Sequence, residues 1–464
     1  MYILMLVIFV LGYTAIALEH NIRVDKAASA LVTGVLCWTV YVLGATNIVD
    51  FNAIPDALLN LFSEEGHISD KHEVITHYVT HYQILEQLSE IASILFFLIG
   101  AMTIVELIDA HEGFTVITDK ITTTSKVKLL WITALITFFM SAALDNLTTT
   151  IVMVSLLKKL INSQQQRWLF AGIIVIAANA GGAWSPIGDV TTTMLWIGGQ
   201  ITTTKIIAGI ILPSIVCLAV PLVWLSFKVK GNVVRPRKAS TKDHYLDPTS
   251  KFERNFVFFA GILGLLMVPV YKTVTHLPPF MGMLLSLGML WLMTDILHRS
   301  KNHEFRVKYS VVGVIRKIDT PSVLFFLGIL LAVGSLQGAG HLGQMASFLD
   351  NSIGTDTPNG VFGVGMVIGV LSSIVDNVPL VAASMGMYPL ASTGFFMEDG
   401  LFWEFLAYCA GTGGSALIIG SAAGVAAMGL ESISFGWYLK RISRLALLGY
   451  FAGAIVYIGE HMLF

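Results

Sequence analysis

The sequence predicts an all-α polytopic membrane protein made of two inverted-topology repeats, each with about five transmembrane spans and one re-entrant hairpin. Three observations indicate this fold class. Of the 464 residues, 55% are hydrophobic and only 12% are charged, as is typical of chains that cross a bilayer many times. Apolar segments recur from one end of the chain to the other. Some of them are interrupted near their middle, and the interruptions recur in both halves.

The apolar segments define the expected elements in order. In the first half we expect spans at 2–18, 27–45, 91–110 and 204–227, a hairpin at 129–160 and a broken helix at 168–198. In the second half we expect spans at 254–273, 277–297, 321–337 and 435–462, a hairpin at 359–391 and a broken helix at 402–429. We therefore divide the chain into an N-terminal repeat (1–228), a basic cytoplasmic linker (229–253) and a C-terminal inverted repeat (254–464).

The segment 129–160 is too long for one straight membrane helix. It would measure about 48 Å at 1.5 Å per residue, whereas the hydrocarbon core is about 30 Å thick. Asp145 and Asn146 lie at its centre. We therefore expect a hairpin that enters the membrane, turns near mid-depth at these two residues and returns.

The broken helices are predicted from small residues and proline inside apolar runs. We expect the breaks at Gly181, Gly182, Pro186 and Gly188, beside Asp189, and at Gly413 and Gly414 in the second half. Irregular backbone is tolerated at membrane depth only where it lines a protein-buried or water-filled cavity. Hairpin tips and broken helices that meet near the midplane are typical of ion sites in secondary transporters.

Short motifs repeat between the two halves at nearly constant spacing. DNLTT at 145–149 matches DNVPL at 376–380, the Gly181-Gly182 pair matches Gly413-Gly414, and FFLIG at 96–100 resembles FFLGI at 325–329. An odd number of spans in each half inverts the second copy relative to the first. The pattern therefore predicts an inverted-topology repeat.

The distribution of charge predicts the orientation. If both termini lie on the outer side of the membrane, the cytoplasmic loops hold nearly all the Lys and Arg residues. Only Lys71, Lys205 and Lys272 then lie on the outer side. Short cytoplasmic loops carry an excess of Lys and Arg in bacterial inner membranes and elsewhere. We therefore expect a multi-pass protein of the cytoplasmic (inner) cell membrane.

Three carboxylates lie at predicted membrane depth. Asp145 and Asp376 are at the hairpin tips, and Asp189 is beside the first helix break. The alternative role for the two tip residues is to cap the following helix, which Asp favours. Capping explains the residue type but not a charge at this depth, where ionisable residues are costly and usually functional.

Oxygen-bearing side chains surround these carboxylates and suit a small hard cation. We expect ligands among Asn146, Thr148, Thr149, Ser185, Thr191, Asn377 and Ser415. The alternative for the hydroxyl groups is hydrogen bonding within their own helices or close helix packing.

The carboxylates also predict the sign of the substrate. Helix N-termini at the tips alone would favour an anion, but the tip carboxylates offset these dipoles and repel anions. A carboxylate in a poorly solvated cavity binds either a proton or a cation, and this competition couples two opposite fluxes. The sequence thus predicts proton-coupled cation antiport with no cofactor beyond the transported ions.

Other charged residues lie near the ends of predicted spans. Glu106, Asp109 and His111 follow one another at the cytoplasmic end of the third span and suit a proton path or pH sensing, or a solvated interfacial cluster. We expect Asp295 and Glu404, which lie near span ends, to be interfacial.

Several long motifs resemble the NhaD-type sodium/proton antiporters of the ion-transporter superfamily. They are MTIVELIDAHEGF at 102–114, ALDNLTTTIVM at 143–153, NAGGAWSPIGDVTTTMLW at 179–196, SSIVDNVPLVAA at 372–383 and GTGGSALIIGSAAGVAAMG at 411–429. The resemblance covers essentially the whole chain. It implies exchange of Na⁺ or Li⁺ for H⁺, a homodimer, and elevator-like movement of a transport domain that contains the hairpins. It also places Asp145, Asn146, Ser185, Asp189, Thr191, Asp376, Asn377 and Ser415 where the superfamily has its ion and substrate site.

One departure from the superfamily bears on the substrate. Its dicarboxylate carriers have a Ser-Asn-Thr motif at each tip, where this chain has Asp-Asn. The repeat is also asymmetric, because Ser421 occupies the position that matches Asp189. Our hypothesis is therefore Na⁺ binding at Asp145 and Asp189, with Asp376 as the proton-carrying partner.

Three other function classes compete with cation antiport. The same superfamily contains anion carriers and arsenite-type exporters, against which the tip carboxylates argue. An intramembrane aspartyl hydrolase could use paired aspartates, but hydrolysis does not require an inverted repeat, so we expect no enzyme. A sensor would need a signalling domain that the sequence does not contain, and the net charge of −2 gives no reason to expect nucleic acid as a partner. The expected partners are the lipid bilayer and the transported ions.

Overall fold

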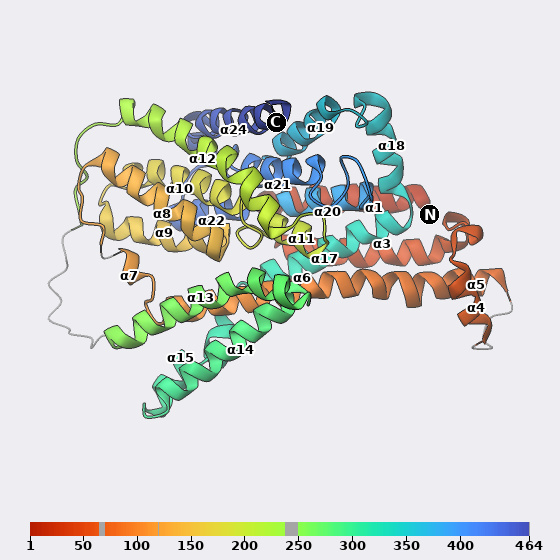
Figure 1. The fold of residues 1–464 in the computed structure, drawn as a ribbon, viewed down its shortest axis with the longest axis horizontal. Helices are drawn as coiled ribbons and strands as arrows, with labels where there is room; N and C mark the ends of the chain where they lie inside the picture. The colour runs from red at the N-terminus through yellow and green to blue at the C-terminus, as the bar shows by residue number, and fades with distance from the viewer. Residues whose placement is uncertain (65–69, 119, 237–248, 464) are drawn as a thin grey trace. The chain divides into compact units, whose positions relative to one another are not determined.

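The computed structural model describes residues 1–64, 70–118, 120–236 and 249–463, and the regular elements in these ranges are all helical (Figure 1). Eight of the helices in the described part are long and apolar enough to cross a membrane. The protein is therefore a polytopic membrane protein, as its composition predicts. Residues 237–248 of the predicted linker lie outside the described residues.

The chain forms two compact units, and each combines segments from distant parts of the sequence. The first unit comprises Met1–Leu95, Asp319–Ser352 and Ala382–Pro389. Its helices are α1 (Tyr2–Ala17), α2 (Glu19–Ile22), α3 (Lys26–Ile48), η1 (Phe51–Ala53), α4 (Asp56–Glu64), α5 (Lys71–His77), η2 (Tyr78–Gln83), the start of α6 (Ile84–Ala110), α17 (Thr320–Gly338), most of α18 (His341–Ile353) and the end of α20 (Asn377–Met387).

Packing in the first unit is centred on α3, which lies between α1 and α17. The backbones of α3 and α17 approach closely at two glycines. A Cβ on Gly34 would lie 2.5 Å from the carbonyl oxygen of Gly328, and a Cβ on Gly328 would lie 2.5 Å from the backbone of Ala30. Small residues at such crossings allow membrane helices to pack without the large side chains that would separate them.

The third predicted span is longer than expected. Helices α5, η2 and α6 follow one another without a break, and Lys71–Ala110 forms one continuous helix of 40 residues. The span predicted at 91–110 is therefore only its C-terminal half. The polar residues of its N-terminal half obscured this continuity, because hydropathy reports apolar length and not helix length.

The second unit comprises Phe96–Ile318, Ile353–Val381 and Leu390–Phe464. It contains the rest of α6 together with α7 (Thr115–Thr118), α8 (Lys126–Leu144), α9 (Asn146–Leu160), α10 (Gln164–Ala183), α11 (Val190–Ile197), α12 (Thr203–Lys228), α13 (Lys251–Thr275), α14 (Pro279–His298), α15 (His303–Tyr309), α16 (Val311–Val314), η3 (Ile315–Lys317), α19 (Pro358–Leu371), the start of α20, α21 (Leu401–Gly413), α22 (Ala422–Glu431), α23 (Phe435–Arg441) and α24 (Ser443–Leu463).

The interruptions expected from the sequence lie at or close to boundaries between helices of this unit, but Gly181, Gly182 and Gly413 are still helical and the breaks begin after them. Asp145 alone separates α8 from α9, and residues 372–376 separate α19 from α20. Residues 184–189 separate α10 from α11, and residues 414–421 separate α21 from α22. Helices α8, α9 and α10 lie side by side (Figure 1), so the first hairpin packs against the first broken helix.

Equivalent contacts hold the hairpins to the broken helices in both halves. Ser141 Oγ donates to the carbonyl of Ala178 at 2.6 Å, and Ser372 Oγ donates to the carbonyl of Ala410 at 2.8 Å. The two serines occupy matching positions before the Asp-Asn pairs. The two halves therefore share not only motifs but also individual hydrogen bonds.

Glycines allow the same close approach in both halves. A Cβ on Gly181 would collide with the backbone carbonyl of Phe138, and a Cβ on Gly413 would collide with that of Gly369. Helix α10 continues through Gly181 and Gly182 to Ala183, so the break begins only after them. These glycines let the hairpin backbone lie against the broken helix immediately before the break.

Candidate functional site

The first hairpin turns at Asp145 with a backbone conformation that is unusual for this residue. Its φ of 93° and ψ of 160° lie in a region that L side chains rarely adopt. Oδ1 accepts from the backbone N–H of Thr148 at 2.8 Å, and Oδ2 accepts from Thr148 Oγ1 at 2.9 Å. Asp145 thus caps α9, as the alternative interpretation expected, and its carboxylate is held at the tip.

The carboxylate of Asp189 is the centre of the polar cluster. Asp189 is 2% exposed and precedes α11, and its Oδ1 accepts from the backbone N–H of Thr191 at 3.1 Å. Asn146 Nδ2 donates to Oδ2 at 2.8 Å, and Asn377 Nδ2 lies 3.4 Å from the same oxygen. Amides from both predicted hairpin tips therefore converge on one buried carboxylate.

A second amide, Asn179, bridges the two halves of the chain. Its Oδ1 accepts from Asn146 Nδ2 at 3.1 Å, and its Nδ2 donates to the hydroxyl groups of Ser415 and Ser421, each at 2.9 Å. Asn179 is completely buried. It therefore fixes the orientation of Asn146 and places Ser415 in the cluster.

Sequence reasoning did not select Asn179 as a site residue. The signal was present, because Asn179 is a polar amide inside the apolar run IIVIAANAGG, two residues before Gly181. A buried polar residue in such a run needs a hydrogen-bond partner. Ser421 was noted only as the counterpart of Asp189, and its contact with Asn179 requires the folded chain.

The predicted hydroxyl ligands fall into two groups. Ser185 Oγ donates to the carbonyl of Ala142 at 2.6 Å, and Thr148 Oγ1 is bonded to Asp145, so both hydroxyls are already used. Thr149 Oγ1 and Thr191 Oγ1 are buried and have no hydrogen-bond partner within the described part of the chain. A buried hydroxyl without a partner is costly, so these two oxygens have unused hydrogen-bonding capacity.

A small cavity of about 20 Å³ adjoins the two carboxylates of the first half. Asp145, Asp189 and Thr193 line it together with apolar residues of α6, α13 and α14. This volume accommodates about one water-sized particle. A site of this size suits a single small ion that has lost most of its hydration shell.

The electrostatic environment of the cluster is acidic. Asp376 and Asp145 are both close enough to Asp189 to act on it electrostatically. Among the described residues, no Lys or Arg forms an ion pair with Asp145 or Asp189. Buried carboxylates without a basic partner must be neutralised by a proton or by a cation.

Comparison with known proteins identifies the family. Residues 5–403 match the family model described as "Citrate transporter". Sodium/proton antiporter 1 of Arabidopsis thaliana is 45% identical over 99% of this chain and 72% of its own length, and sodium/proton antiporter 2 of the same plant is 41% identical over 98% and 99%. The Na⁺/H⁺ antiporter NhaD of Vibrio cholerae is 28% identical over 98% of this chain and 90% of its own length.

The chain belongs to the citrate transporter family and, within it, to the NhaD-type sodium/proton antiporters. The motifs that suggested this resemblance contain the residues that the fold brings together. Asp145, Asn146, Asn179, Asp189, Asn377 and Ser415 come from four of the five motifs.

Asp376 differs from the other two aspartates in its surroundings. It is half-buried at the second tip, and its Oδ1 accepts from the backbone N–H of Val378 at 3.3 Å.

Pro186 and Gly188 lie in the non-helical segment before α11, where a Cβ on Gly188 would lie 2.8 Å from the carbonyl of Ser141. Gly414 follows the last residue of α21 at the corresponding break.

The acidic group near the end of α6 makes other contacts. Asp109 lines a separate cavity of about 360 Å³ together with Glu112 and Lys159, and Glu106 is half-buried on the same helix. His111 follows the helix, is buried, and its Nδ1 lies 2.7 Å from the carbonyl of Leu107. Burial lowers the pKa of His111 to about 4, so its ring is neutral at neutral pH.

Glu404 is buried within the protein, which its position near a span end did not predict. The residue is 4% exposed because α12 and α24 cover it. Tyr457 Oη donates to Glu404 Oε2 at 3.1 Å. Its place at the start of α21 was compatible with exposure, and only the packing of distant helices buries it. Asp295 is exposed, as expected.

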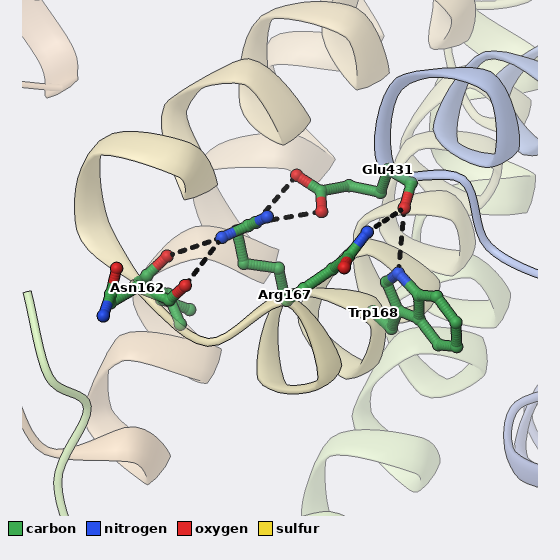
Figure 2. A network of polar contacts seen from close by, with 6 residues as sticks. Asn162, Arg167, Trp168 and Glu431 are labelled. Atoms are coloured by element: carbon green, nitrogen blue, oxygen red, sulfur yellow. Dashed lines mark hydrogen bonds and ion pairs between the residues drawn. The ribbon is translucent and has the colours of Figure 1, made fainter. Parts of the chain in front are cut away.

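A buried ion pair joins the start of α10 to the end of α22 (Figure 2). Arg167 Nε lies 2.9 Å from both carboxylate oxygens of Glu431, whose side chain is completely buried. The side chains of Gln164 and Trp168 donate to the backbone carbonyl of Glu431, and Arg167 also donates to the carbonyl of Asn162. The network ties the two broken helices together at the end away from their breaks.

Proposed function

We propose that the protein exchanges Na⁺ or Li⁺ for H⁺ across the cytoplasmic membrane by alternating access. The observation that carries this proposal is the Asp189 carboxylate, which is buried, bonded only to uncharged donors and accompanied by two further aspartates, Asp145 and Asp376. Such a carboxylate binds a proton or a cation, but not both well. The antiporter names of its plant and bacterial relatives agree with this chemistry.

Within this proposal Na⁺ binds at Asp145 and Asp189. The small cavity adjoins both carboxylates, and the unpartnered hydroxyls of Thr149 and Thr191 belong to the helices that these residues cap. Hard oxygen ligands of this kind suit a small cation. Asp376 is the proton-carrying partner, since it stands near Asp189 at the second hairpin tip.

The matching hydrogen bonds of Ser141 and Ser372 support the two inverted repeats and the two re-entrant hairpins. The proposed orientation has both termini outside. Elevator-like movement and a homodimer rest on the resemblance to the wider superfamily. Cysteine accessibility at the two ends of the chain tests the orientation, and chemical crosslinking in the membrane tests the dimer.

The exchange is tested by proton movement in everted membrane vesicles that hold a preformed pH gradient. Addition of Na⁺ or Li⁺ between about pH 6 and pH 9 should dissipate the gradient, because a cation that binds the cluster displaces its proton. Vesicles carrying Asp145→Asn should not respond, and K⁺ serves as the comparison cation. A normal response from the Asp145→Asn variant would overturn the assignment of the site.

A second candidate function is transport of a carboxylate anion such as citrate. The description of the matching family model favours it, whereas the three aspartates of the cluster repel anions. Uptake of labelled citrate into vesicles distinguishes the two functions. Citrate uptake without any cation response would make the anion carrier the correct function.

A further inference from the structure

Glu404 is a buried carboxylate that the proposed exchange does not use. It lies in the first turn of α21, and a Cβ on Gly209 of α12 would approach its Oε2 to 2.8 Å. Tyr457 Oη donates to Oε2 at 3.1 Å, and His461 Nε2 lies 3.9 Å from the same oxygen. The carboxylate is therefore enclosed by three helices and faces one imidazole.

The contacts of His461 determine how many protons this pair holds. Its Nδ1 lies 3.1 Å from the backbone carbonyl of Tyr457. A carbonyl only accepts, so Nδ1 carries a proton and a neutral ring would present the lone pair of Nε2 to Glu404. Attraction between the two side chains requires one further proton, on Nε2 or on the carboxyl group.

Two helix ends favour the charged form of the pair. Glu404 lies in the first turn of α21, where the helix dipole stabilises an anion, and His461 lies in the last turn of α24, where it stabilises a cation. Within the described part of the chain, Lys205 of α12 and Asp399 before α21 act on Glu404 with opposite signs, and Glu460 acts on Tyr457. A carboxylate–imidazolium pair is the arrangement that these two helix ends favour.

We propose that Glu404 and His461 form a proton-binding site separate from the aspartate cluster, whose proton holds the start of α21 to the end of α24 and is released as the pH rises. After release, the buried carboxylate keeps the Tyr457 hydroxyl but faces a lone pair on His461. The start of α21 is then held less firmly.

Helix α21 connects this site to the aspartate cluster. Gly411 lies seven residues after Glu404, about 10 Å along the helix. A Cβ on Gly411 would lie 3.9 Å from Asp189 Oδ2. A change in how firmly the start of α21 is held therefore reaches the helix face that contacts Asp189. The inference concerns proton binding and does not require the proposed exchange to be correct.

The test is thermal unfolding of the purified full-length protein in detergent between about pH 6 and pH 9. An ion pair that needs a protonated imidazole stabilises the fold at acidic pH and loses this effect as the pH rises through the titration of the pair. We expect the wild type to unfold about 2 °C above His461→Gln at the acidic end, with the difference vanishing at the alkaline end. Glu404→Gln should behave in the same way, and the double variant should match the single ones.

Two further variants sharpen this test. His461→Lys keeps a positive charge at alkaline pH and should retain the stabilisation there. His303→Gln changes an exposed histidine of α15 and should leave the pH dependence unchanged. A difference between wild type and His461→Gln that is the same at every pH, or additive effects of the two single variants, would overturn the proposal.

Hydrogen–deuterium exchange of the wild type keeps the proposal testable if the variants do not fold. The amides of the first turns of α21 should exchange faster at alkaline pH by more than the base-catalysed increase measured for α10. An increase equal to that of α10 would contradict release of this helix end.

Discussion

The two broken helices have nearly the same backbone and different chemistry. Asp189 precedes α11 with φ −147° and ψ 146°, and Ser421 precedes α22 with φ −150° and ψ 155°. Both side chains accept a hydrogen bond from a backbone N–H of the helix that follows. One of them is charged and the other is neutral. The backbone conformation at these two positions therefore repeats while the charge does not.

The two hairpin tips also differ, in the length of the turn and in the hydrogen bonds of their aspartates. Asp145 alone forms the first turn and its carboxylate accepts from the backbone N–H and the hydroxyl of Thr148, whereas Asp376 ends the longer segment 372–376 and accepts from the backbone N–H of Val378. Both neighbouring amides, Asn146 and Asn377, nevertheless point to Asp189. The second half thus contributes neutral donors to a carboxylate of the first half.

The largest effect is expected from removing the charge at Asp189. Asp189→Asn keeps the size of the side chain but loses about 3 kcal/mol of charge-assisted interaction, so cation-dependent proton movement in vesicles should fall by about 100-fold or more. Ser421→Ala removes the equivalent neutral cap and should cost about fivefold or less. Similar losses in both variants would mean that the halves are functionally equivalent after all.

Substitutions of the two tip aspartates should distinguish loss of Na⁺ binding from loss of proton coupling. We expect both Asp145→Asn and Asp376→Asn to abolish cation-dependent proton movement. Equilibrium binding of ²²Na⁺ should be lost by about 100-fold in Asp145→Asn, because a carboxylate ligand is removed, but should change by about threefold or less in Asp376→Asn. Loss of Na⁺ binding in the Asp376 variant alone would reverse the two roles.

Asn179→Ala should weaken the connection between the halves. It removes one partner of Asn146 and one donor to each of the hydroxyls of Ser415 and Ser421, at a cost of about 1–3 kcal/mol. We expect the KM for Na⁺ to rise by about tenfold with a smaller change in kcat, measured by the vesicle assay over a range of Na⁺ concentrations. Asn302→Ala, at an exposed cap of α15, is the control. An unchanged KM in Asn179→Ala would show that the bridge does not position the site.

The smallest effect is expected at the matched serines that hold the hairpins. Ser141→Ala and Ser372→Ala each remove one buried hydrogen bond, worth about 1 kcal/mol, and should lower the unfolding temperature by nearly equal amounts of about 1–2 °C. Thermal unfolding in detergent measures this. A loss confined to one of the two variants would show that the packing of the halves is less alike than their sequences.

The sequence by itself determined the membrane class, the places where helices stop and the residues that carry charge at those places. Long apolar runs leave helices as the only way to satisfy the backbone in a bilayer, and Asp, Gly and Pro inside such runs have few structural explanations. The turn at Asp145 and the break before Asp189 follow from this local chemistry. So does the family, because its motifs surround the same residues.

Only the tertiary structure decided which of these residues meet. The convergence of Asn146 and Asn377 on one carboxylate, and the bridge through Asn179, join positions far apart in the chain. The burial of Glu404 also depends on distant segments. The pattern of its own segment predicted an interfacial position, and α12 and α24 bury it. Burial and hydrogen bonding between distant segments depend on how whole helices pack, whereas the pattern of a single segment reports only its own helix and its own ends.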